Sequence, residues 1–295
     1  MRIAVFTKNR TNPAYMAARL GADRAAAVFG DEVSHLVPET PDDPQEQISL
    51  IDRALAGAPD AIVLSPVHAS RVDPAILRIR AAGVPVFAFV NPVEAAPTIT
   101  YVGADDARLA ADVAGYLFAR MGGKGRVLIV GGHVESVTSI ARVTAFEHAA
   151  RAMPGIEVVG HCVGDYQRGV AREAVARWLG LHHEAPDAVL VANDIMAVGV
   201  IDALQAAGKR ALVVGVNAIP EAIDAIREGR MLATADFNAM QMAFTATECA
   251  ARHLRGERMP ARVDLPVDLV DASNFHHWDR PYEARPVKTL AEILA

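Results

Sequence analysis

The sequence predicts an α/β fold made of two doubly wound parallel-sheet domains. Short runs rich in Val, Ile and Leu alternate with longer Ala-rich stretches of helical period, the pattern of β-α units on a parallel sheet that is buried on both faces. The chain also repeats short fragments at a nearly constant spacing. Its 295 residues, 52% of them hydrophobic, are enough to give each of two domains its own core.

Each predicted strand is a short apolar run, and helices fill most of the gaps between strands. Pro13 stands near the start of the first helix, and Gly83 and Gly208 follow predicted helix ends, where a left-handed conformation or a stop is needed. The predicted strands are 2–6, 31–36, 60–65, 85–90, 98–102, 126–130, 156–161, 187–192, 211–216, 231–235 and 266–270.

The internal repeat supports a duplication. The tetrapeptide APDA enters a strand at 58–61 and again at 185–188, and the tripeptide AAG precedes strands that end in Asn91 and in Asn217. Chance is the alternative for each fragment, because Ala, Gly and Val are abundant. The shared spacing and the shared position relative to strands favour two similar domains.

Polar residues follow several predicted strands at their carboxyl ends. In doubly wound sheets these ends border the crevice where ligands bind, so the residues converge if two such domains face each other. Asparagine side chains there supply neutral donors and acceptors suited to hydroxyl groups, although any one of them could simply form a turn. The residues are those of segment 8–12, Ser65, Asn91, Asn193, Asp194 and Asn217.

Two aromatic residues and one arginine are further candidates. Tyr15 follows Asn12-Pro13, and Tyr166 follows a strand of the second half, so both could pack against the C–H face of a sugar ring. Packing of Tyr15 within its own domain is the competing interpretation. Arg142, near the start of a helix, is either a planar donor fork for ligand hydroxyls or a surface residue.

Composition and motifs exclude several classes of function. The net charge of −6 argues against coating nucleic acid or anionic lipid, and no apolar run is long enough to cross a bilayer. Cys162 and Cys249 have no metal-binding spacing, and they permit one disulfide without implying it. Neither a phosphate-binding glycine loop nor a nucleophile motif is present, so we predict no cofactor and no enzymatic activity.

Seven segments, taken in order, give the chain a recognisable pattern. They are TNPAY (11–15), DAIVLSP (60–66), YVGADD (101–106), GKGRVLIVGG (123–132), ARVTAF (141–146), LVANDIMAVGVIDAL (190–204) and VVGVN (213–217). Over nearly its whole length the chain resembles the ribose/galactose-type periplasmic substrate-binding proteins of bacterial ABC importers. These proteins share their core with the effector domains of lac-repressor-type regulators.

The resemblance implies two α/β domains joined by a three-stranded hinge, with a ligand cleft between them. The expected N-terminal lobe is 1–104 plus 239–265, and the expected C-terminal lobe is 105–238 plus 266–295, the latter including a tail that packs on a domain surface. By position, the resemblance implies ligand contacts from Asn12, Tyr15, Ser65, Arg142, Tyr166 and Asn193.

The chain departs from the family pattern at three places. Asn91 and Asn217 stand where many members carry aspartates that bind sugar hydroxyls, and an amide can donate as well as accept. Near the hinge, either Asp236 or Phe237 takes the place of a polar contact. Lys8 and Arg10 add positive charge at the cleft mouth or inside it, or either is solvated at the rim; with the two lost carboxylates, this leaves an acidic sugar as an alternative ligand.

The resemblance implies a non-enzymatic, monomeric solute-binding protein that delivers a monosaccharide or sugar alcohol to the membrane permease of an ABC importer. A periplasmic location follows from it, with the leader absent from a chain that opens MRIAVFTKNR. The alternative is the sugar-sensing effector domain of a lac-repressor-type regulator. The first predicted strand, 2–6, leaves no room before it for a helix-turn-helix, so nucleic acid is not an expected partner.

Overall fold

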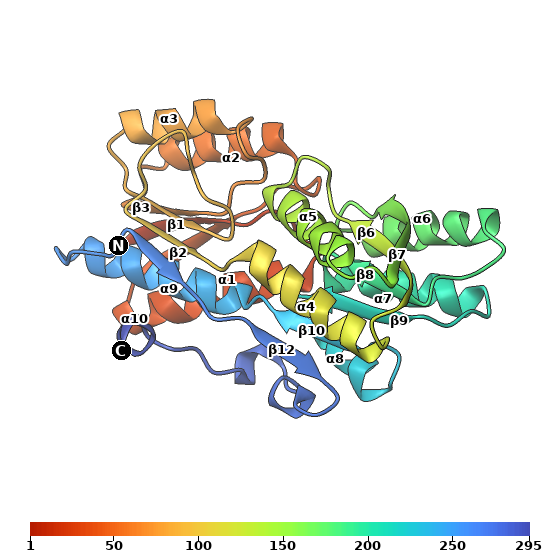
Figure 1. Cartoon of the computed structure of the whole chain (residues 1–295). Helices are drawn as coiled ribbons and strands as arrows, with labels where there is room; N and C mark the ends of the chain where they lie inside the picture. Colours follow the sequence, from red (N-terminus) through yellow and green to blue (C-terminus); the bar gives the residue numbers. More distant parts are fainter. The chain divides into compact units, whose positions relative to one another are not determined.

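The protein forms two compact α/β units in a computed structural model that describes residues 1–295. Unit 1 comprises Met1–Ala104, Asn238–Pro266 and Tyr282–Ala295, and unit 2 comprises Asp105–Phe237 and Val267–Pro281. The chain passes between the units at the three expected places, near residues 104, 237 and 266, and a fourth time near residue 281. Figure 1 follows this path by colour.

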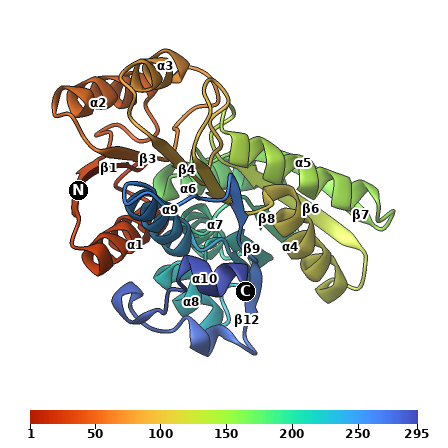
Figure 2. The ribbon, with the colours of Figure 1, turned by 90° about the vertical axis from the view of Figure 1, so that its left-hand side faces the viewer.

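Unit 1 contains a six-stranded sheet of order β11-β5-β4-β3-β1-β2 in which every pair of neighbours is parallel. Figures 1 and 2 show α2 and α3 on one face of this sheet and α1 and α9 on the other. Its elements are β1 (Arg2–Phe6), α1 (Pro13–Phe29), β2 (Glu32–Leu36), α2 (Pro44–Ala56), β3 (Ala61–Leu64), α3 (Asp73–Ala81), β4 (Val86–Phe89), β5 (Thr100–Gly103), α9 (Ala239–His253), β11 (Arg262–Asp264), a 3-10 turn (Tyr282–Ala284) and α10 (Leu290–Leu294).

Unit 2 contains a second six-stranded sheet, of order β12-β10-β9-β8-β6-β7, in which only β12 runs antiparallel to its neighbour. Helix α4 packs on α5, and α7 packs on both α6 and α8. Its elements are α4 (Asp106–Arg120), β6 (Gly125–Gly131), α5 (Val137–Arg151), β7 (Ile156–Val163), α6 (Arg168–Leu181), β8 (Ala188–Val191), α7 (Asp194–Ala206), β9 (Leu212–Val216), α8 (Pro220–Arg227), β10 (Ala233–Asp236), β12 (Asp268–Asp271) and a 3-10 turn (Phe275–His277).

The same topology in both units gives the sequence repeat a physical explanation. In unit 1, Asp60 exchanges hydrogen bonds with the backbone of Arg2: the Arg2 amide donates to Asp60 Oδ2 at 2.6 Å, and the Asp60 amide donates to the Arg2 carbonyl at 2.8 Å. In unit 2, Asp187 does the same with Arg126, at 2.7 and 2.9 Å. The repeated APDA segment therefore links the starts of two neighbouring inner strands in both halves, β1 to β3 and β6 to β8.

All eleven predicted strands are present, each within about two residues of its predicted ends, which is inside the usual boundary error. Strand β11 was not predicted. It spans only Arg262–Asp264, and of its three residues only Val263 is buried, so the segment has no apolar run to reveal it.

The expected assignment of the whole tail to the C-terminal lobe is wrong. Residues 267–281 belong to unit 2, but residues 282–295 pack in unit 1. Tyr282 lies in a small buried cluster with Ala17 of α1 and Met240 of α9. The side-chain amide of Gln241 makes two hydrogen bonds to the backbone of Lys288: Nε2 donates to the carbonyl and Oε1 accepts from the amide, both at 2.7 Å.

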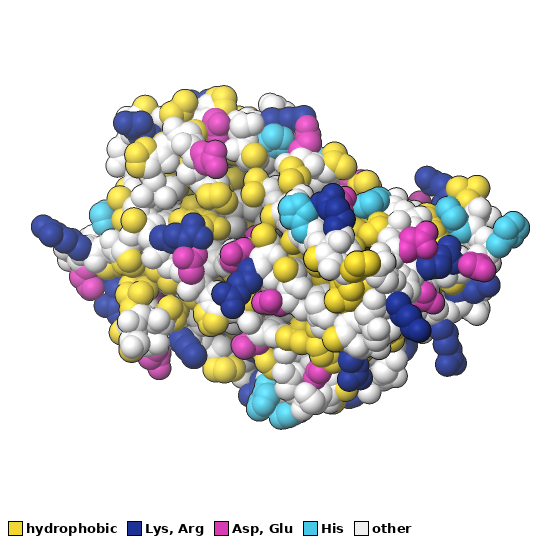
Figure 3. Space-filling view, in the orientation of Figure 1, with side chains coloured by type: hydrophobic (Ala, Val, Ile, Leu, Met, Phe, Trp, Pro, Cys, Tyr) yellow, Lys and Arg dark blue, Asp and Glu magenta, His cyan; other side chains and the backbone are white.

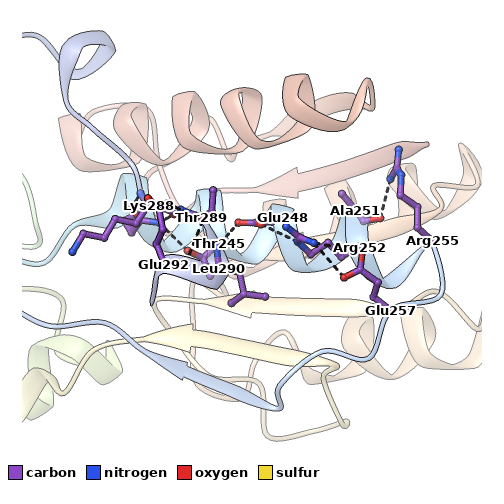
Figure 4. Close-up of polar contacts among 11 residues, drawn as sticks. Thr245, Glu248, Ala251, Arg252, Arg255, Glu257, Lys288, Thr289, Leu290 and Glu292 are labelled. Atoms are coloured by element: carbon purple, nitrogen blue, oxygen red, sulfur yellow. Dashed lines mark hydrogen bonds and ion pairs between the residues drawn. The ribbon is translucent and has the colours of Figure 1, made fainter. Parts of the chain in front are cut away.

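A buried glutamate completes the attachment of the C-terminal segment to α9. Glu248 is 2% exposed, and its carboxylate accepts hydrogen bonds from the amide of Leu290 at 2.7 Å and from Arg252 Nε at 2.9 Å. Figure 4 shows this carboxylate between the two donors, with Glu257 on the outer side of Arg252. A charge-assisted hydrogen bond thus holds the C-terminal segment on α9, in addition to the small apolar cluster around Tyr282.

We predict that Glu248→Ala lowers the free energy of unfolding by about 2–4 kcal/mol, because a buried amide and a guanidinium lose their acceptor. Glu257→Ala is the matched control, since it removes the exposed partner of the same arginine and should cost less than about 1 kcal/mol. Chemical denaturation followed by circular dichroism measures both variants. Equal, small effects would contradict the structural role given to Glu248.

Candidate functional site

Strained backbone gathers where strands end at their carboxyl termini. Val90 follows β4 with φ 65°, Tyr166 follows β7 with φ 56°, and Asn217 and Ala218 follow β9 with φ 128° and 51°. Left-handed conformations are costly for residues other than glycine, most of all for β-branched valine, and they concentrate at functional sites. This observation marks the same ends of the strands as the polar residues do.

In unit 1, the segment after β1 is organised around a buried ion pair. Lys8 is 2% exposed, and its Nζ lies 3.0 Å from Asp42 Oδ1, while Asn9 Nδ2 donates to Asp42 Oδ2 at 2.9 Å. Asn9 Oδ1 in turn accepts from the Asn12 amide, and Asn12 Oδ1 caps α1 by accepting from Ala14. A rim position for Lys8 is therefore wrong, whereas Arg10 is exposed beside Glu39.

Two further predicted residues of unit 1, Ser65 and Asn91, have buried polar atoms without a partner in the protein. Ser65 follows β3 and its Oγ has no hydrogen bond, although its backbone is fixed by Gln47, which donates to the Ser65 carbonyl at 3.0 Å. Asn91 Nδ2 donates to the Pro66 carbonyl at 2.8 Å, and Asn91 Oδ1 has no partner. Buried polar atoms are nearly always paired, so these two atoms are available to a ligand.

The Pro66 carbonyl fixes the orientation of the Asn91 amide. A carbonyl only accepts, so the nitrogen must face Pro66 and the oxygen must face the other way. Asn91 therefore offers the acceptor that an aspartate would offer, without the charge. An aspartate here would place an oxygen against the Pro66 carbonyl, which explains the departure from the family pattern at this position.

In unit 2, a buried arginine is neutralised by an acidic residue of α4. Arg142 is 3% exposed; its Nε and Nη2 lie 2.8 and 2.7 Å from Asp106 Oδ1, and its Nη1 donates to the Ala192 carbonyl at 2.7 Å. The guanidinium also lies over the ring of Phe237, 4.8 Å from its centre. The interpretation of Arg142 as a surface residue is therefore wrong.

Asp236 and Phe237, the two residues considered near the hinge, each have a structural role in unit 2. Asp236 Oδ2 accepts a 2.8 Å hydrogen bond from the indole of Trp278, and Phe237 is 5% exposed beneath Arg142. These contacts assign the carboxylate to the unit's own tail and the ring to the support of Arg142. A ligand contact from either residue stays a prediction.

The two tyrosines are both buried. Tyr166 donates to or accepts from Thr138 Oγ1 at 2.8 Å, and Thr138 is linked to Ser136 at 3.0 Å. Its ring covers Gly132, where an added Cβ would lie 2.3 Å from a ring carbon, so glycine is required there. Tyr15, on α1, is 8% exposed, so packing within its own domain accounts for most of its surface.

Asn193, like Asn91, has one bonded and one unpartnered side-chain atom, but here the oxygen is bonded and the nitrogen has no partner. Its Oδ1 accepts from the Met196 amide at 3.1 Å and caps α7, while its Nδ2 is buried without a partner. An amide N–H only donates, so the oxygen must be the atom that faces the Met196 amide and the nitrogen is the atom left without a partner. Unit 1 thus presents a hydroxyl and an acceptor, and unit 2 presents a donor.

Asp194, the residue after Asn193, has hydrogen-bond partners for its carboxylate within the protein. Asp194 is fully buried, and its carboxylate accepts from Thr234 Oγ1 at 2.7 Å and from the Ile219 amide at 3.2 Å. Burial raises the pKa of Asp194 to about 7, while the hydrogen bonds from Thr234, Ile219 and Ala218 and the charge of Arg142 act in the other direction. The Asn217 amide donates to the Ala235 carbonyl at 2.8 Å, which anchors the start of the strained turn.

Sequence reasoning placed the predicted residues at the right strand ends but missed their partners. Asp42, Asp106 and Gln47 were not singled out, because each lies in a loop or a helix far along the chain from the residue it supports. The DD pair at 105–106 was the available signal: Asp105 caps α4 and Asp106 faces Arg142.

The remaining chemical groups point to no other kind of site. Cys162 and Cys249 are free thiols, and burial raises their pKa values to about 11 and about 12. No group of three His, Cys, Asp or Glu side chains could hold a metal ion. None of the helices has both the length and the apolar character needed to span a bilayer.

Comparison with known proteins agrees with this architecture. The chain is 26% identical over 193 residues to a xylitol-binding protein of Mycolicibacterium smegmatis, a match that covers 65% of this chain and 55% of that protein. It is 24% identical to the ribose import binding protein of Bacillus subtilis over 90% of this chain and 85% of the relative. A solute-binding protein from Mycobacterium smegmatis, solved with bound glycerol, is 27% identical with a TM-score of 0.86, over 94% of this chain and 96% of that one.

A galactofuranose-binding protein shares the fold at a TM-score of 0.88 and 20% identity, over 97% of this chain and 98% of that one. The family model of the periplasmic binding protein domain matches residues 3–258, which include both sheets except β11 and β12 and all the predicted site residues. The chain belongs to the periplasmic binding protein domain family.

Proposed function

We propose that the protein is the solute-binding component of an ABC importer and binds a neutral sugar or polyol through the polar residues at the strand ends of its two units. The observation that carries this proposal is that three of the buried polar atoms without partners belong to neutral residues directly after strands β3, β4 and β8: Ser65 Oγ, Asn91 Oδ1 and Asn193 Nδ2. A hydroxyl group both donates and accepts, so a molecule with several hydroxyls can satisfy all three. The names of the relatives, which bind xylitol and ribose, support this class of ligand.

The charges at these strand ends favour a neutral ligand over an acidic one. Lys8 and Arg142 are the buried cations among the predicted site residues, and each already lies within 3.0 Å of a carboxylate of its own unit. A ligand carboxylate would have to compete with Asp42 or Asp106 and would lie near them, which is unfavourable at low dielectric. The acidic sugar considered from the sequence is therefore the weaker candidate.

Closure of the two units on the ligand is part of the proposal. Only a closed form lets donors of one unit and acceptors of the other bind the same molecule, so the ligand would shift the population toward that form. We further propose a periplasmic location, a membrane permease as the partner and no role for nucleic acid. Acidic and basic side chains are interspersed over the face shown in Figure 3, as on an ordinary solvated surface.

Isothermal titration against a panel tests the proposal. The panel contains pentoses, hexoses, pentitols, inositol and glycerol, each with a matched sugar acid where one exists, and the protein is first freed of co-purified ligand by unfolding and refolding. We expect at least one neutral member to bind and its acid counterpart to bind at least about tenfold more weakly, a difference of about 1.4 kcal/mol. Absence of binding across the panel would overturn the proposed function.

We predict that Ser65→Ala weakens binding of that ligand about 3- to 10-fold, the value of one neutral hydrogen bond, about 0.5–1.5 kcal/mol. The thermal midpoint of the ligand-free protein should not fall, because Ser65 Oγ has no partner to lose. Thr247→Val is the matched control: Thr247 Oγ1 is also buried without a partner, but it lies within α9. If both variants bind like the wild type, Ser65 is not a ligand contact.

We predict that Asn193→Asp separates helix capping from ligand binding. Aspartate caps helices as well as asparagine does, so α7 should keep its cap, while the added charge at a position only 1% exposed should lower the thermal midpoint. The donor Nδ2 is replaced by an acceptor, so the dissociation constant should rise at least about tenfold. Asn193→Ala should lower both affinity and stability, the latter by about 1 kcal/mol for the lost cap. Wild-type affinity in Asn193→Asp would show that Asn193 only caps α7.

A further inference from the structure

The fully buried carboxylate of Asp194 has no role in the contacts proposed above. Asp194 begins α7, directly after Asn193, yet its two carboxylate oxygens lie in the interior of unit 2. Thr234 of β10 donates to Oδ1 at 2.7 Å, and the Ile219 amide donates to Oδ2 at 3.2 Å. The Ala218 amide also faces this carboxyl group and lies 3.4 Å from Thr234 Oγ1.

The surrounding strands are adapted to this carboxylate. At Gly215 of β9, an added Cβ would lie 2.3 Å from Asp194 Oδ1, so the close approach requires glycine. Thr234 pairs with Gly215 across the sheet in the register of β9 and β10, which places its hydroxyl on the same group. Three elements, α7, β9 and β10, therefore meet at one carboxylate.

The carboxylate holds the turn that carries Asn217. Asn217 and Ala218 have φ 128° and 51°, and the amides of Ala218 and Ile219 point to Asp194. Successive amides in such a turn form a small concave site for an anion, and charge-assisted bonds are stronger than neutral ones. The ionised side chain thus offsets the strain of two consecutive residues that lack the freedom of glycine.

We propose that Asp194 is a positioning residue that fixes the turn 217–219 and thereby holds Asn217 in the conformation that binds the ligand. The inference rests on the proposed function, because it assumes that Asn217 contacts the sugar. Asp194 itself touches no ligand.

Protonation of Asp194 removes part of this support. A protonated carboxyl must donate its hydrogen, but two of its three neighbours are backbone amides, and only the Thr234 hydroxyl can accept. The charged group that acts on it is Arg142 of α5, which is paired with Asp106 of α4; the neighbours on β9, β10 and the turn are uncharged. The pKa of about 7 places this change near neutral pH.

Affinity and stability then respond to pH in opposite directions. The pKa of Asp194 is raised from 3.8 to about 7 in the folded protein, so the folded state binds more protons than the unfolded state between these values. The free energy of unfolding therefore falls as pH rises through that window. Ligand affinity should rise with pH as the carboxylate ionises, and a residue with a purely structural role would not produce this opposition.

The test is titration from pH 5.5 to 8.5 with the tightest neutral ligand of the panel, D-ribose and xylitol being tried first, on the wild type and on Asp194→Asn. We expect wild-type affinity to fall several-fold between pH 8 and pH 6, and Asp194→Asn to bind more weakly with a flat profile. The pH dependence of unfolding should also be reduced in the variant. Wild-type affinity with the wild-type profile in Asp194→Asn would overturn the inference.

A second pair of variants covers the case in which Asp194→Asn does not fold. Thr234→Val removes the hydroxyl donor at the same carboxylate and should weaken binding, while Thr234→Ser should restore it. Equal affinity in both variants and in the wild type would overturn the inference. A wild-type protein that binds no member of the panel refutes the proposed function instead, so the two failures are distinguishable.

Discussion

Parallel strands covered by helices on both faces leave only the ends of a sheet for polar chemistry. In each unit the central strands are buried along their whole length, so their side chains serve the core. Polar groups that meet a ligand must therefore come from residues that follow the strands. This constraint concentrates strained backbone, buried ion pairs and unpaired polar atoms within a few residues of the same set of strand ends.

At those ends, the charged groups and the neutral groups are used differently. Lys8 and Arg142 are each neutralised by a carboxylate of their own unit, so they act first as fixed parts of the scaffold. Three of the buried atoms left without partners belong to neutral side chains, Ser65, Asn91 and Asn193. Leaving a buried polar atom unpaired costs stability, which a ligand hydroxyl can restore. The proposed preference for an uncharged ligand rests on this pairing of Lys8 and Arg142 within the protein.

The elements and the strand ends could be predicted from the sequence, because an apolar run followed by a polar residue is a local signal. The residues that pair with these side chains, or pack against them, could not be predicted. The sequence left Lys8 open between the cleft and its rim, because its neutralising carboxylate, Asp42, lies beyond the next helix and strand. The last residues looked like part of the second lobe because nothing local shows that Tyr282 packs with Ala17 and Met240. Long-range pairing decides such cases, and one sequence does not display it.

Asn193 and Asp194 show how one helix start can serve two purposes. Both are polar residues at the amino end of α7, and both are suited to that position by the helix dipole. Asn193 caps the helix with its oxygen, and its nitrogen is left without a partner in the protein. Asp194, one residue on, points into the unit and binds the turn after β9. The residue that follows β8 thereby shapes the turn that follows β9, so that Asp194, without a proposed ligand contact, can set the geometry of Asn217, for which a contact is proposed.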